Sequence, residues 1–374
     1  MTMQTKRFWL ARAVCAAVVC AGVVFMASAE IVIETVPVDN PGNAGELSGG
    51  GAGGYGSDRI CGAVAYEYNI GKYEVTAGQY TEFLNAVDPS GSNPYGLYNA
   101  NMDSSSYGCQ ITWNAGSSRY DFSGCPSGVE GDWINRPVNY VSWGDAARFA
   151  NWLHNGQPQQ QLTGNPVNDL GVTEDGAYFL NDATSNAALL AVSRESDWKW
   201  AITSEDEWYK AAYHKNDGAT GNYFDYPTSS DTAPGYVNNS GNLSSTGNPF
   251  VEGGTDPGNY ATYDDDGGTD GIGSPYYRTV VGEWENSDST YGTFDQGGNV
   301  WEWNEAILDS CRGVRGGSFA RDDDSLHASI RYDLVNAAYE GHVFGFRVSQ
   351  VPEPASIALL ALGGLAMIRR RRRH

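Results

Sequence analysis

The chain has 374 residues and a formal net charge of −22, with 45 acidic residues against 23 lysines and arginines. This acidic excess argues against nucleic acid as a partner, because its phosphates would be repelled. Gly (47 residues) and Tyr (23 residues) are abundant. Such a composition is typical of a loop-rich fold with long irregular connections, in which aromatic rings supply much of the apolar area.

The first 29 residues have the three parts of a secretory signal peptide. Lys6, Arg7 and Arg12 form a positive front, residues 13–26 are apolar, and Ala-Ser-Ala follows at 27–29. This pattern predicts export with cleavage before Glu30. The alternative is an uncleaved membrane anchor, for which the apolar stretch is short.

The remaining chain divides into a lead-in and one domain. Residues 30–58 are Gly-rich and predict a flexible lead-in to a single domain over 59–350. Val64, Tyr66, Tyr68 and Ile70 alternate with polar or small residues, which predicts a half-buried strand.

Three helices are predicted from capping boxes followed by apolar positions at helical spacing. The first box is Thr76 with Gln79, and the helix ends at Asp88-Pro89. The second begins at Ser142 with Asp145, and the third at Ser204 with Glu207. Near the end, apolar residues alternate again over 344–348, which predicts a further strand. Together these elements predict an α+β fold with few helices, short antiparallel strands and much ordered loop.

Four cysteines lie outside the predicted signal peptide. An even number in an exported chain favours disulfides, with three possible pairings. Cys109 and Cys125 flank a turn-rich stretch. Joining them would stabilise the fold by about 3 kcal/mol in the chain-entropy description. Cys61 and Cys311 would then form the second pair, with two free buried thiols as the alternative.

Residues 351–374 form a second targeting segment. Pro352-Glu353-Pro354 precedes an apolar run over 355–368, and five arginines close the segment at 369–373. This arrangement resembles the bacterial PEP-CTERM sorting signal. The resemblance implies recognition by an exosortase-type membrane protease, a transient membrane anchor at 355–368, and a final place in the cell envelope or outside the cell. Losing both end segments removes eight basic residues and one acidic residue, so the net charge falls from −22 to −29.

Six blocks in the central part occur in the order found in one known family. They are GKYEVT (71–76), RPVNYVSW (136–143), SEDEW (204–208), GNVWEW (298–303), RGGSF (315–319) and GFRV (345–348). Together they resemble the formylglycine-generating-enzyme, or sulfatase-modifying-factor, family. The resemblance implies a single compact domain related to the C-type-lectin-like fold.

The same resemblance implies calcium at two loops. The first site would use the backbone carbonyls of Asp295, Gly298 and Val300 with the carboxylate of Glu302. The alternative is that Glu302 caps or salt-bridges within a structural loop. A second site would use the residues Asn259, Tyr260, Asp264 and Asp266, for which a solvated acidic turn is the alternative.

The catalytic cysteines of the family are missing. Active members hold Cu(I) with two cysteines shortly after the Gly-Gly-Ser motif, and those positions fall here on Arg321 and Leu326. Neither side chain is a ligand for this soft ion, and no cysteine follows Cys311, so copper is not expected. Trp301 and Ser318 match residues that border the family's oxygen pocket, although a structural role accounts for both.

Two functions follow as hypotheses. The first is a noncatalytic, exported binding or structural module, with a glycan or protein ligand of unknown identity. Its ligand groove would lie on the former active-site face, near Trp301, Ser318, Arg321, His327 and Arg331. The two arginines could meet an acidic or sugar-like ligand, although the acidic excess favours the alternative that they pair with the chain's own carboxylates. The alternative is an oxidoreductase of the formylglycine-generating type that acts on a sulfatase cysteine with non-standard active-site ligands.

Overall fold

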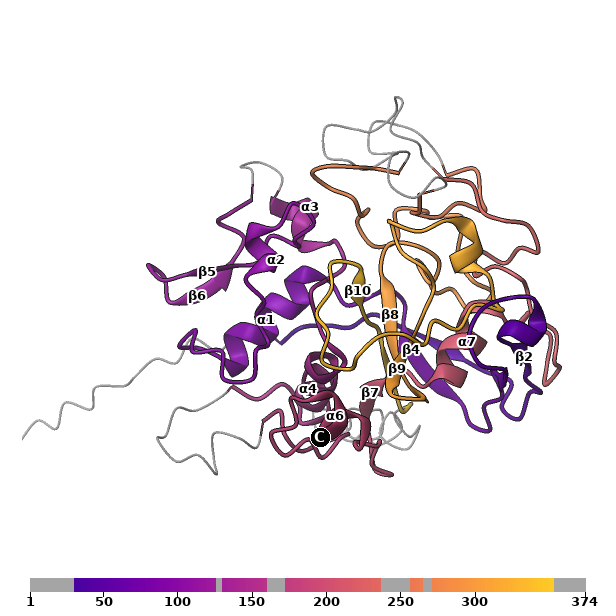
Figure 1. Cartoon of the computed structure of the whole chain (residues 1–374), viewed down its shortest axis with the longest axis horizontal. Helices are drawn as coiled ribbons and strands as arrows, with labels where there is room; N and C mark the ends of the chain where they lie inside the picture. Colours follow the sequence, from indigo (N-terminus) through magenta and orange to yellow (C-terminus); the bar gives the residue numbers. More distant parts are fainter. Residues whose placement is uncertain (1–29, 126–129, 160–171, 237–255, 265–270, 353–374) are drawn as a thin grey trace, which may run out of the picture.

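The computed structural model describes residues 30–125, 130–159, 172–236, 256–264 and 271–352 (Figure 1). The helices are α1 (Ala77–Val87), α2 (Asn101–Ser104), α3 (Glu130–Ile134), α4 (Trp143–His154), α6 (Asn186–Leu190) and α7 (Glu205–Tyr213), with 3₁₀ turns η1 (Gly50–Ala52) and η2 (Asp323–Leu326). The strands are β1 (Thr35–Val38), β2 (Glu46–Ser48), β3 (Arg59–Cys61), β4 (Tyr68–Gly71), β5 (Thr112–Asn114), β6 (Arg119–Asp121), β7 (Trp200–Ile202), β8 (Trp301–Leu308), β9 (Cys311–Arg315), β10 (Phe344–Gly345) and β11 (Val348–Gln350). Few helices and short strands joined by long loops confirm the predicted α+β class.

The main sheet is antiparallel and has the strand order β1-β4-β11-β7. Its first strand comes from the segment that the sequence predicted to be a flexible lead-in. Thr35 pairs with Gly71 and Val38 with Tyr68, while β2 pairs with β3. The prediction was wrong because backbone pairing orders this segment despite its many glycines. The predicted strand over 64–70 forms only from Tyr68 onward.

A second sheet has the order β10-β8-β9, with β8 and β9 forming an antiparallel hairpin and β10 lying parallel to β8. The predicted strand over 344–348 is therefore divided between two sheets. Phe344 pairs with Trp301 in the second sheet, whereas Val348 pairs with Ile202 in the main sheet. Phe346 and Arg347 join the two sheets, and both side chains are buried.

All three predicted capping boxes are present. Thr76, Ser142 and Ser204 are the N-caps of α1, α4 and α7, and each box is completed by the predicted residue three positions later. The buried faces of α1 and α4 meet in the largest hydrophobic cluster, where the rings of Phe83 and Phe149 are 5.3 Å apart. Figure 1 shows these two helices beside β10, with α7 beyond β4 and β9.

Cys61, Cys109, Cys125 and Cys311 are free thiols, so neither predicted disulfide is formed in the structure. Cys61 lies 3.3 Å from Nη2 of Arg315, at the far end of β9 from Cys311. Four residues of strand span about 13 Å, which exceeds the reach of a disulfide. Cys109 is buried in the largest hydrophobic cluster, to which Cys125 does not belong.

No helix among the described residues is long and apolar enough to cross a membrane. The predicted signal peptide and nearly all of the sorting segment lie outside those residues.

Candidate functional site

The Gly-Gly-Ser loop follows β9 and is held against the loop that precedes β8. Gly298 N donates to Gly316 O (2.8 Å), and Phe319 N donates to Asn299 O (3.0 Å). Gly316 has a φ of 97°, and a Cβ there would lie 2.7 Å from Gln296 O. Only glycine suits this close, left-handed position, so the sequence itself fixes how the two loops meet.

Two residues expected beside a reaction pocket are instead part of the packed interior. Ser318 is fully buried, and its Oγ accepts a hydrogen bond from Ala320 N (3.4 Å). Trp301 is also buried, and its ring stacks on that of Tyr332 with centroids 5.2 Å apart. These contacts fit the structural role that the sequence left open for both residues.

The two positions that carry thiols in active relatives face different surroundings. Leu326, at the end of η2, is fully buried in a small cluster with Tyr226, Ala261 and Tyr263. Arg321 is exposed, and its backbone carbonyl accepts a hydrogen bond from Asp264 N (2.9 Å). The side chain of Leu326 therefore packs the interior beneath the loop, while that of Arg321 is available at the surface.

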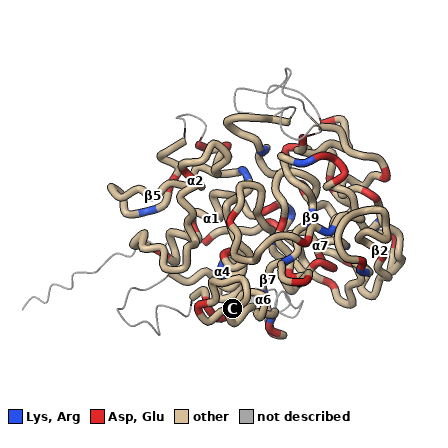
Figure 2. The backbone as a smooth tube through the Cα atoms, viewed as in Figure 1, with Lys and Arg blue, Asp and Glu red and all other residues tan. Residues whose placement is uncertain are grey.

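Arg331, one of the residues expected near the ligand groove, is instead buried and paired with a carboxylate of the chain itself, which is the alternative that the sequence left open. Its Nε and Nη2 atoms bind the two carboxylate oxygens of Glu205 at 2.7 and 2.8 Å. Arg315 and Arg59 bind the same carboxylate. Figure 2 shows acidic and basic positions of the backbone close together around α7. Burial alone would raise the pKa of Glu205, but Arg315, Arg331 and Arg59 lower it to about 2. Arg331 is thus committed to an internal ion-pair cluster.

His327, the other predicted groove residue, is partly exposed. Its Nδ1 lies 2.8 Å from Ser329 Oγ, and its ring meets that of Tyr226 edge-on at 5.3 Å. Its Nε2 is 3.8 Å from Asp225 Oδ1. The structure separates this histidine from Arg331. His327 packs against Tyr226, whereas Arg331 is bound to Glu205 at the start of α7.

Sequence reasoning missed a group of aromatic side chains beside the Gly-Gly-Ser loop. Tyr107, Tyr277, Phe319 and His342 form this aromatic face, with ring centroids 4.4 Å apart for Tyr107–Tyr277 and 4.7 Å for Tyr107–His342. Phe319 is buried, and the other three rings are partly exposed. The residues come from four separate segments without a shared motif, so only the fold brings them together.

Buried and exposed arginines flank this aromatic face. Arg278 lies beneath it, where Nη1 donates to Tyr107 O (2.9 Å) and Cζ lies 5.6 Å from the ring centroid of Phe319. Burial, followed by the charges of Arg278 and Arg321, lowers the pKa of His342. The imidazole is therefore neutral near pH 7 and offers both a hydrogen-bond donor and an acceptor.

The first expected calcium loop is dominated by a buried ion pair. Glu302 Oε2 accepts hydrogen bonds from Arg347 Nε (2.5 Å) and Trp208 Nε1 (2.8 Å). Glu302 Oε1 accepts a hydrogen bond from Arg347 Nη2 (2.6 Å). This pairing matches the alternative that the sequence left open for Glu302. Oε1 accepts one of these bonds and keeps a second lone pair.

Other oxygens near this loop are compatible with a cation. Glu74 Oε1 is buried without a hydrogen-bond partner, and burial followed by the charges of Asp295 and Glu302 raises the pKa of Glu74 well above its ordinary value. No group of three or more Asp, Glu, His or Cys side chains converges as a metal site within the described ranges. A cation here would thus depend on the loop carbonyls and one carboxylate, which is the donor set expected from the sequence.

The second expected calcium set is only partly described. Asn259 is tied into a turn, because Oδ1 accepts from Thr228 Oγ1 (2.6 Å) and Nδ2 lies 3.3 Å from Thr232 O. Asp264 is buried, whereas Asp266 lies outside the described residues. Tyr260 N donates to Ser287 Oγ (2.9 Å).

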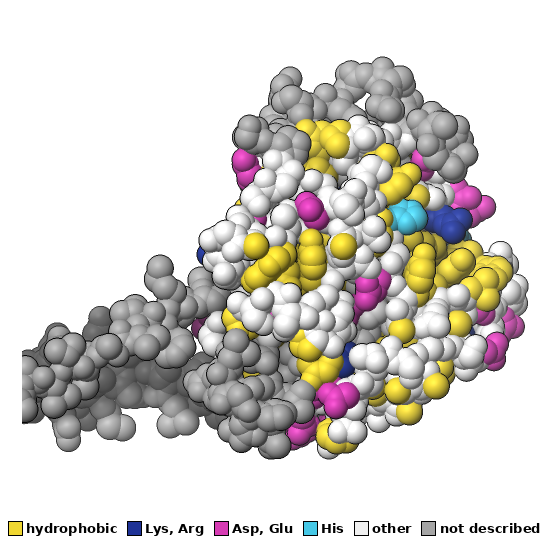
Figure 3. All heavy atoms as spheres, turned by 60° about the vertical axis from the view of Figure 1, so that its left-hand side comes forward, with side chains coloured by type: hydrophobic (Ala, Val, Ile, Leu, Met, Phe, Trp, Pro, Cys, Tyr) yellow, Lys and Arg dark blue, Asp and Glu magenta, His cyan; other side chains and the backbone are white. Residues whose placement is uncertain are grey.

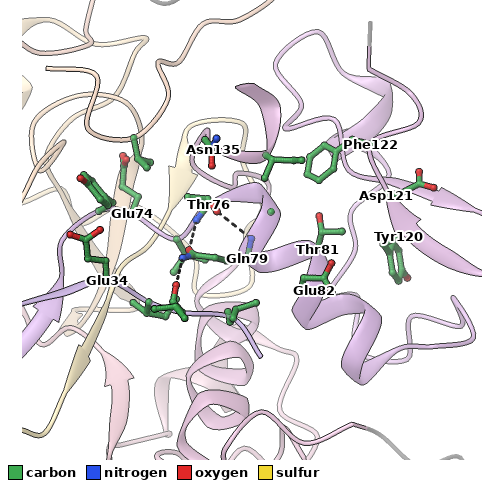
Figure 4. A pocket seen from close by; sticks show the side chains of 18 of the residues that line it. Glu34, Glu74, Thr76, Gln79, Thr81, Glu82, Tyr120, Asp121, Phe122 and Asn135 are labelled. Atoms are coloured by element: carbon green, nitrogen blue, oxygen red, sulfur yellow. Dashed lines mark hydrogen bonds between the residues drawn. The ribbon is translucent and has the colours of Figure 1, made fainter. Parts of the chain in front are cut away.

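A groove of about 670 Å³, which was not predicted from the sequence, lies between α1, β6 and residues 31–34 (Figure 4). Glu34, Glu74, Glu82 and Asp121 make it acidic, while Phe122 and Ile134 contribute apolar surface. Figure 4 shows the capping box of Thr76 and Gln79 beside this groove. Figure 3 shows apolar patches, interrupted by scattered acidic groups, on the side of the molecule that it brings forward.

The sequence profile of the sulfatase-modifying factor enzyme 1-like domain matches residues 62–351. The chain belongs to this family. The match covers all six sequence blocks, including the two loops that Gly298 and Gly316 join. A second profile, the PEP-CTERM protein-sorting motif, matches residues 350–373 and marks the chain for export to the cell envelope.

Several solved structures match most of the chain. The crystal structure of CarF has 19% sequence identity and a TM-score of 0.50, and the match covers 86% of this chain and 99% of CarF. Treponema denticola variable protein 1 has 19% identity and a TM-score of 0.48, with 85% and 95% covered. PvdO from Pseudomonas aeruginosa has 17% identity and a TM-score of 0.42, with 85% and 94% covered. No curated protein matches the chain.

Proposed function

We propose that this protein is a noncatalytic member of the family, exported to the cell envelope, that binds a ligand on the aromatic face beside its Gly-Gly-Ser loop. One observation carries the proposal: Leu326, at a position where active relatives have a thiolate, is a fully buried packing residue. A hydrocarbon side chain offers Cu(I) no donor atom, and the exposed guanidinium of Arg321 is a cation.

The chemistry of the aromatic face favours a glycan as the ligand. Tyr107 and Tyr277 present partly exposed rings, which pack well against the apolar faces of sugar rings. The neutral imidazole of His342 exchanges hydrogen bonds with hydroxyl groups, and Arg321 adds a positive charge for acidic sugars. A chain that is otherwise strongly acidic would repel anions elsewhere.

We also propose a structural calcium ion at the loop before β8. The carbonyls of Asp295, Gly298 and Val300 and the free lone pair of Glu302 Oε1 would hold it. A bound divalent cation would favour the ionised forms of Glu74 and Asp295, whose pKa values are raised chiefly by burial and also by neighbouring carboxylates. The ion would thereby stiffen the loop before β8, where the backbone carbonyl of Asn299 accepts a hydrogen bond from Phe319 of the Gly-Gly-Ser loop.

A glycan array, run with calcium and with a chelator, tests the ligand. We expect hits with the parent protein, a loss of at least tenfold in binding for Tyr277→Ser or Arg321→Ala, and little change for Phe122→Ser. The Phe122 variant is the matched control because this partly buried ring lines the separate acidic groove. Loss of binding with Phe122→Ser alone would place the ligand in the groove, and no hit at all would leave only a structural role.

The alternative function is oxidation of a sulfatase cysteine with non-standard active-site ligands. Its only support is that Trp301 and Ser318 match residues that border the oxygen pocket of the family. Oxygen uptake on a cysteine-containing sulfatase peptide, measured with and without copper, decides the matter. We expect no turnover above a blank without enzyme. Copper-dependent formation of formylglycine would overturn the noncatalytic proposal.

The sorting motif supports a second partner. We propose that an exosortase-type membrane protease recognises residues 351–374 after export and releases the transient anchor at 355–368. Cell fractionation with and without such a protease tests this step. The folded domain should stay with the membrane fraction when the protease is absent.

A further inference from the structure

Both ends of the described domain meet at a single corner of the molecule. Ile31 N donates to Gln157 Oε1, and Gln157 Nε2 donates to Ile31 O, each at 2.8 Å. Val351 N donates to Lys199 O (2.9 Å). Together these segments line a hollow of about 920 Å³, formed by Glu30 to Ile33, Leu153 to Gln157, Trp198 to Trp200 and Gln350 to Pro352. We call this region the terminal pole.

The terminal pole exposes apolar side chains of the kind found at membrane surfaces. Val32 is 81% exposed and Val351 is 41% exposed. Trp198 and Trp200 are partly exposed, with the exposed Lys199 between them. Tryptophan and lysine suit the boundary between lipid headgroups and acyl chains, because each has an apolar body and a polar end. The exposed Glu30 also lies at this pole.

The length of the tether places this pole close to any bilayer that holds the sorting segment. Only three residue steps separate Pro352 from Ala355, where the apolar run begins. An extended chain covers about 10 Å in that distance. The pole therefore lies within about 10 Å of the membrane-inserted run.

The shortness of the apolar run draws the pole closer still. Residues 355–368 would span only about 21 Å as a helix, whereas the hydrocarbon core of a bilayer is about 30 Å thick. In an inserted segment, the five arginines at 369–373 would hold the other end at the opposite surface. A short segment thins the membrane locally and pulls its flanking residues into the headgroup region.

We propose that the terminal pole rests on the lipid surface while residues 355–368 are inserted, with Trp198, Trp200 and Val32 in the headgroup boundary. The partner is the phospholipid bilayer itself. In this orientation α4 and β7, in the lower part of Figure 1, would face the membrane, and the upper part of the domain would face away from it. The proposal rests on the sorting signal and is independent of whether the aromatic face binds a glycan.

Tryptophan quenching in vesicles tests the contact. The chain without its signal peptide, residues 30–374, is reconstituted into phosphatidylcholine vesicles with or without bromine on the acyl chains. Flotation in a density gradient first establishes that the chain is held by the bilayer. We expect brominated lipid to quench the parent protein and to quench Trp198→Phe/Trp200→Phe at least twofold less. Trp113→Phe, which changes a partly buried ring on β5, should leave the quenched signal unchanged.

A second pair of variants guards against misfolding of the tryptophan variants. Val32→Asp should reduce quenching at least twofold because it places a charge at the boundary. Ile60→Asp changes a residue that is 57% exposed on β3, away from the pole, and should have no effect. Flotation with equal quenching in all variants would overturn the proposal, and so would failure of the parent chain to float.

Discussion

Arg347 and Glu302 form an ion pair that is completely shielded from solvent, with Nε–Oε2 and Nη2–Oε1 distances of 2.5 and 2.6 Å. The pair ties the connection between β10 and β11 to the start of β8. Arg347 Nη1 also donates to Gly71 O (3.0 Å) and Nη2 to Phe294 O (2.8 Å). One guanidinium thus connects both sheets and the loop that precedes the second.

Removal of this guanidinium should be costly. We expect Arg347→Met to lower the free energy of unfolding by about 3–5 kcal/mol, because it leaves the Glu302 carboxylate buried without a counter-charge. Urea denaturation of the soluble domain measures the change. Arg119→Met is the control, since Arg119 faces Glu82 at 3.5 Å on the exposed surface and should cost less than about 1 kcal/mol. Equal losses in the two variants would contradict this account.

A matched pair of glycines tests how closely the two site loops approach the rest of the chain. Gly298 and Gly53 have φ values of 85° and 84°. A Cβ at Gly298 would lie 2.2 Å from Thr262 O, whereas nothing lies within 4 Å of one at Gly53. We expect Gly53→Ala to cost about 1–2 kcal/mol from backbone strain alone and Gly298→Ala clearly more. Similar melting temperatures for both variants would show that the contact at Gly298 relaxes freely.

The Glu205 cluster should give the domain an acid-sensitive component of stability. The pKa of Glu205 is lowered from 4.5 to about 2 in the folded protein. The stabilisation is therefore present above pH 4.5 and is lost as the pH falls from 4.5 towards 2. Melting temperatures of the parent and Glu205→Gln should converge over this window. A difference that stays constant from pH 7 to pH 2 would argue against the ion pairs as its source.

Calcium removal should lower thermal stability if the loop before β8 holds the ion. A ligand that binds only the folded state stabilises it, by about 2.7 kcal/mol at a hundredfold excess over its Kd. We expect EDTA to lower the melting temperature and calcium, but not an equal concentration of magnesium, to restore it. An unchanged melting curve after removal of the metal has been verified by mass spectrometry would count against bound calcium.

Local sequence signals predicted the parts of the fold that depend on neighbouring residues. The three capping boxes located α1, α4 and α7 to within a residue, because the bonds that begin these helices are made three positions apart. The resemblance placed Leu326 at a former thiol position, but its packing against Tyr226 and Ala261 required the fold.

Predictions that depended on distant contacts were less successful. The lead-in was assigned flexibility from its glycines, although β1 pairs with a strand more than 30 residues away. Pairing of Arg331 with a carboxylate of the chain was expected as one alternative, but its partner, Glu205, lies 126 residues earlier and could not be named from the sequence. The aromatic face was missed for the same reason, since Tyr107 and His342 are far apart in sequence.

The position of β11 in the main sheet has a consequence for the order of events during export. This last strand lies between β4 and β7, so the sheet remains divided until Val348–Gln350 is in place. If the chain crosses the membrane amino end first, as its predicted signal peptide implies, closure of the domain would wait until almost the entire polypeptide has crossed. The last residue of β11 precedes the apolar run at 355–368 by only a few residues.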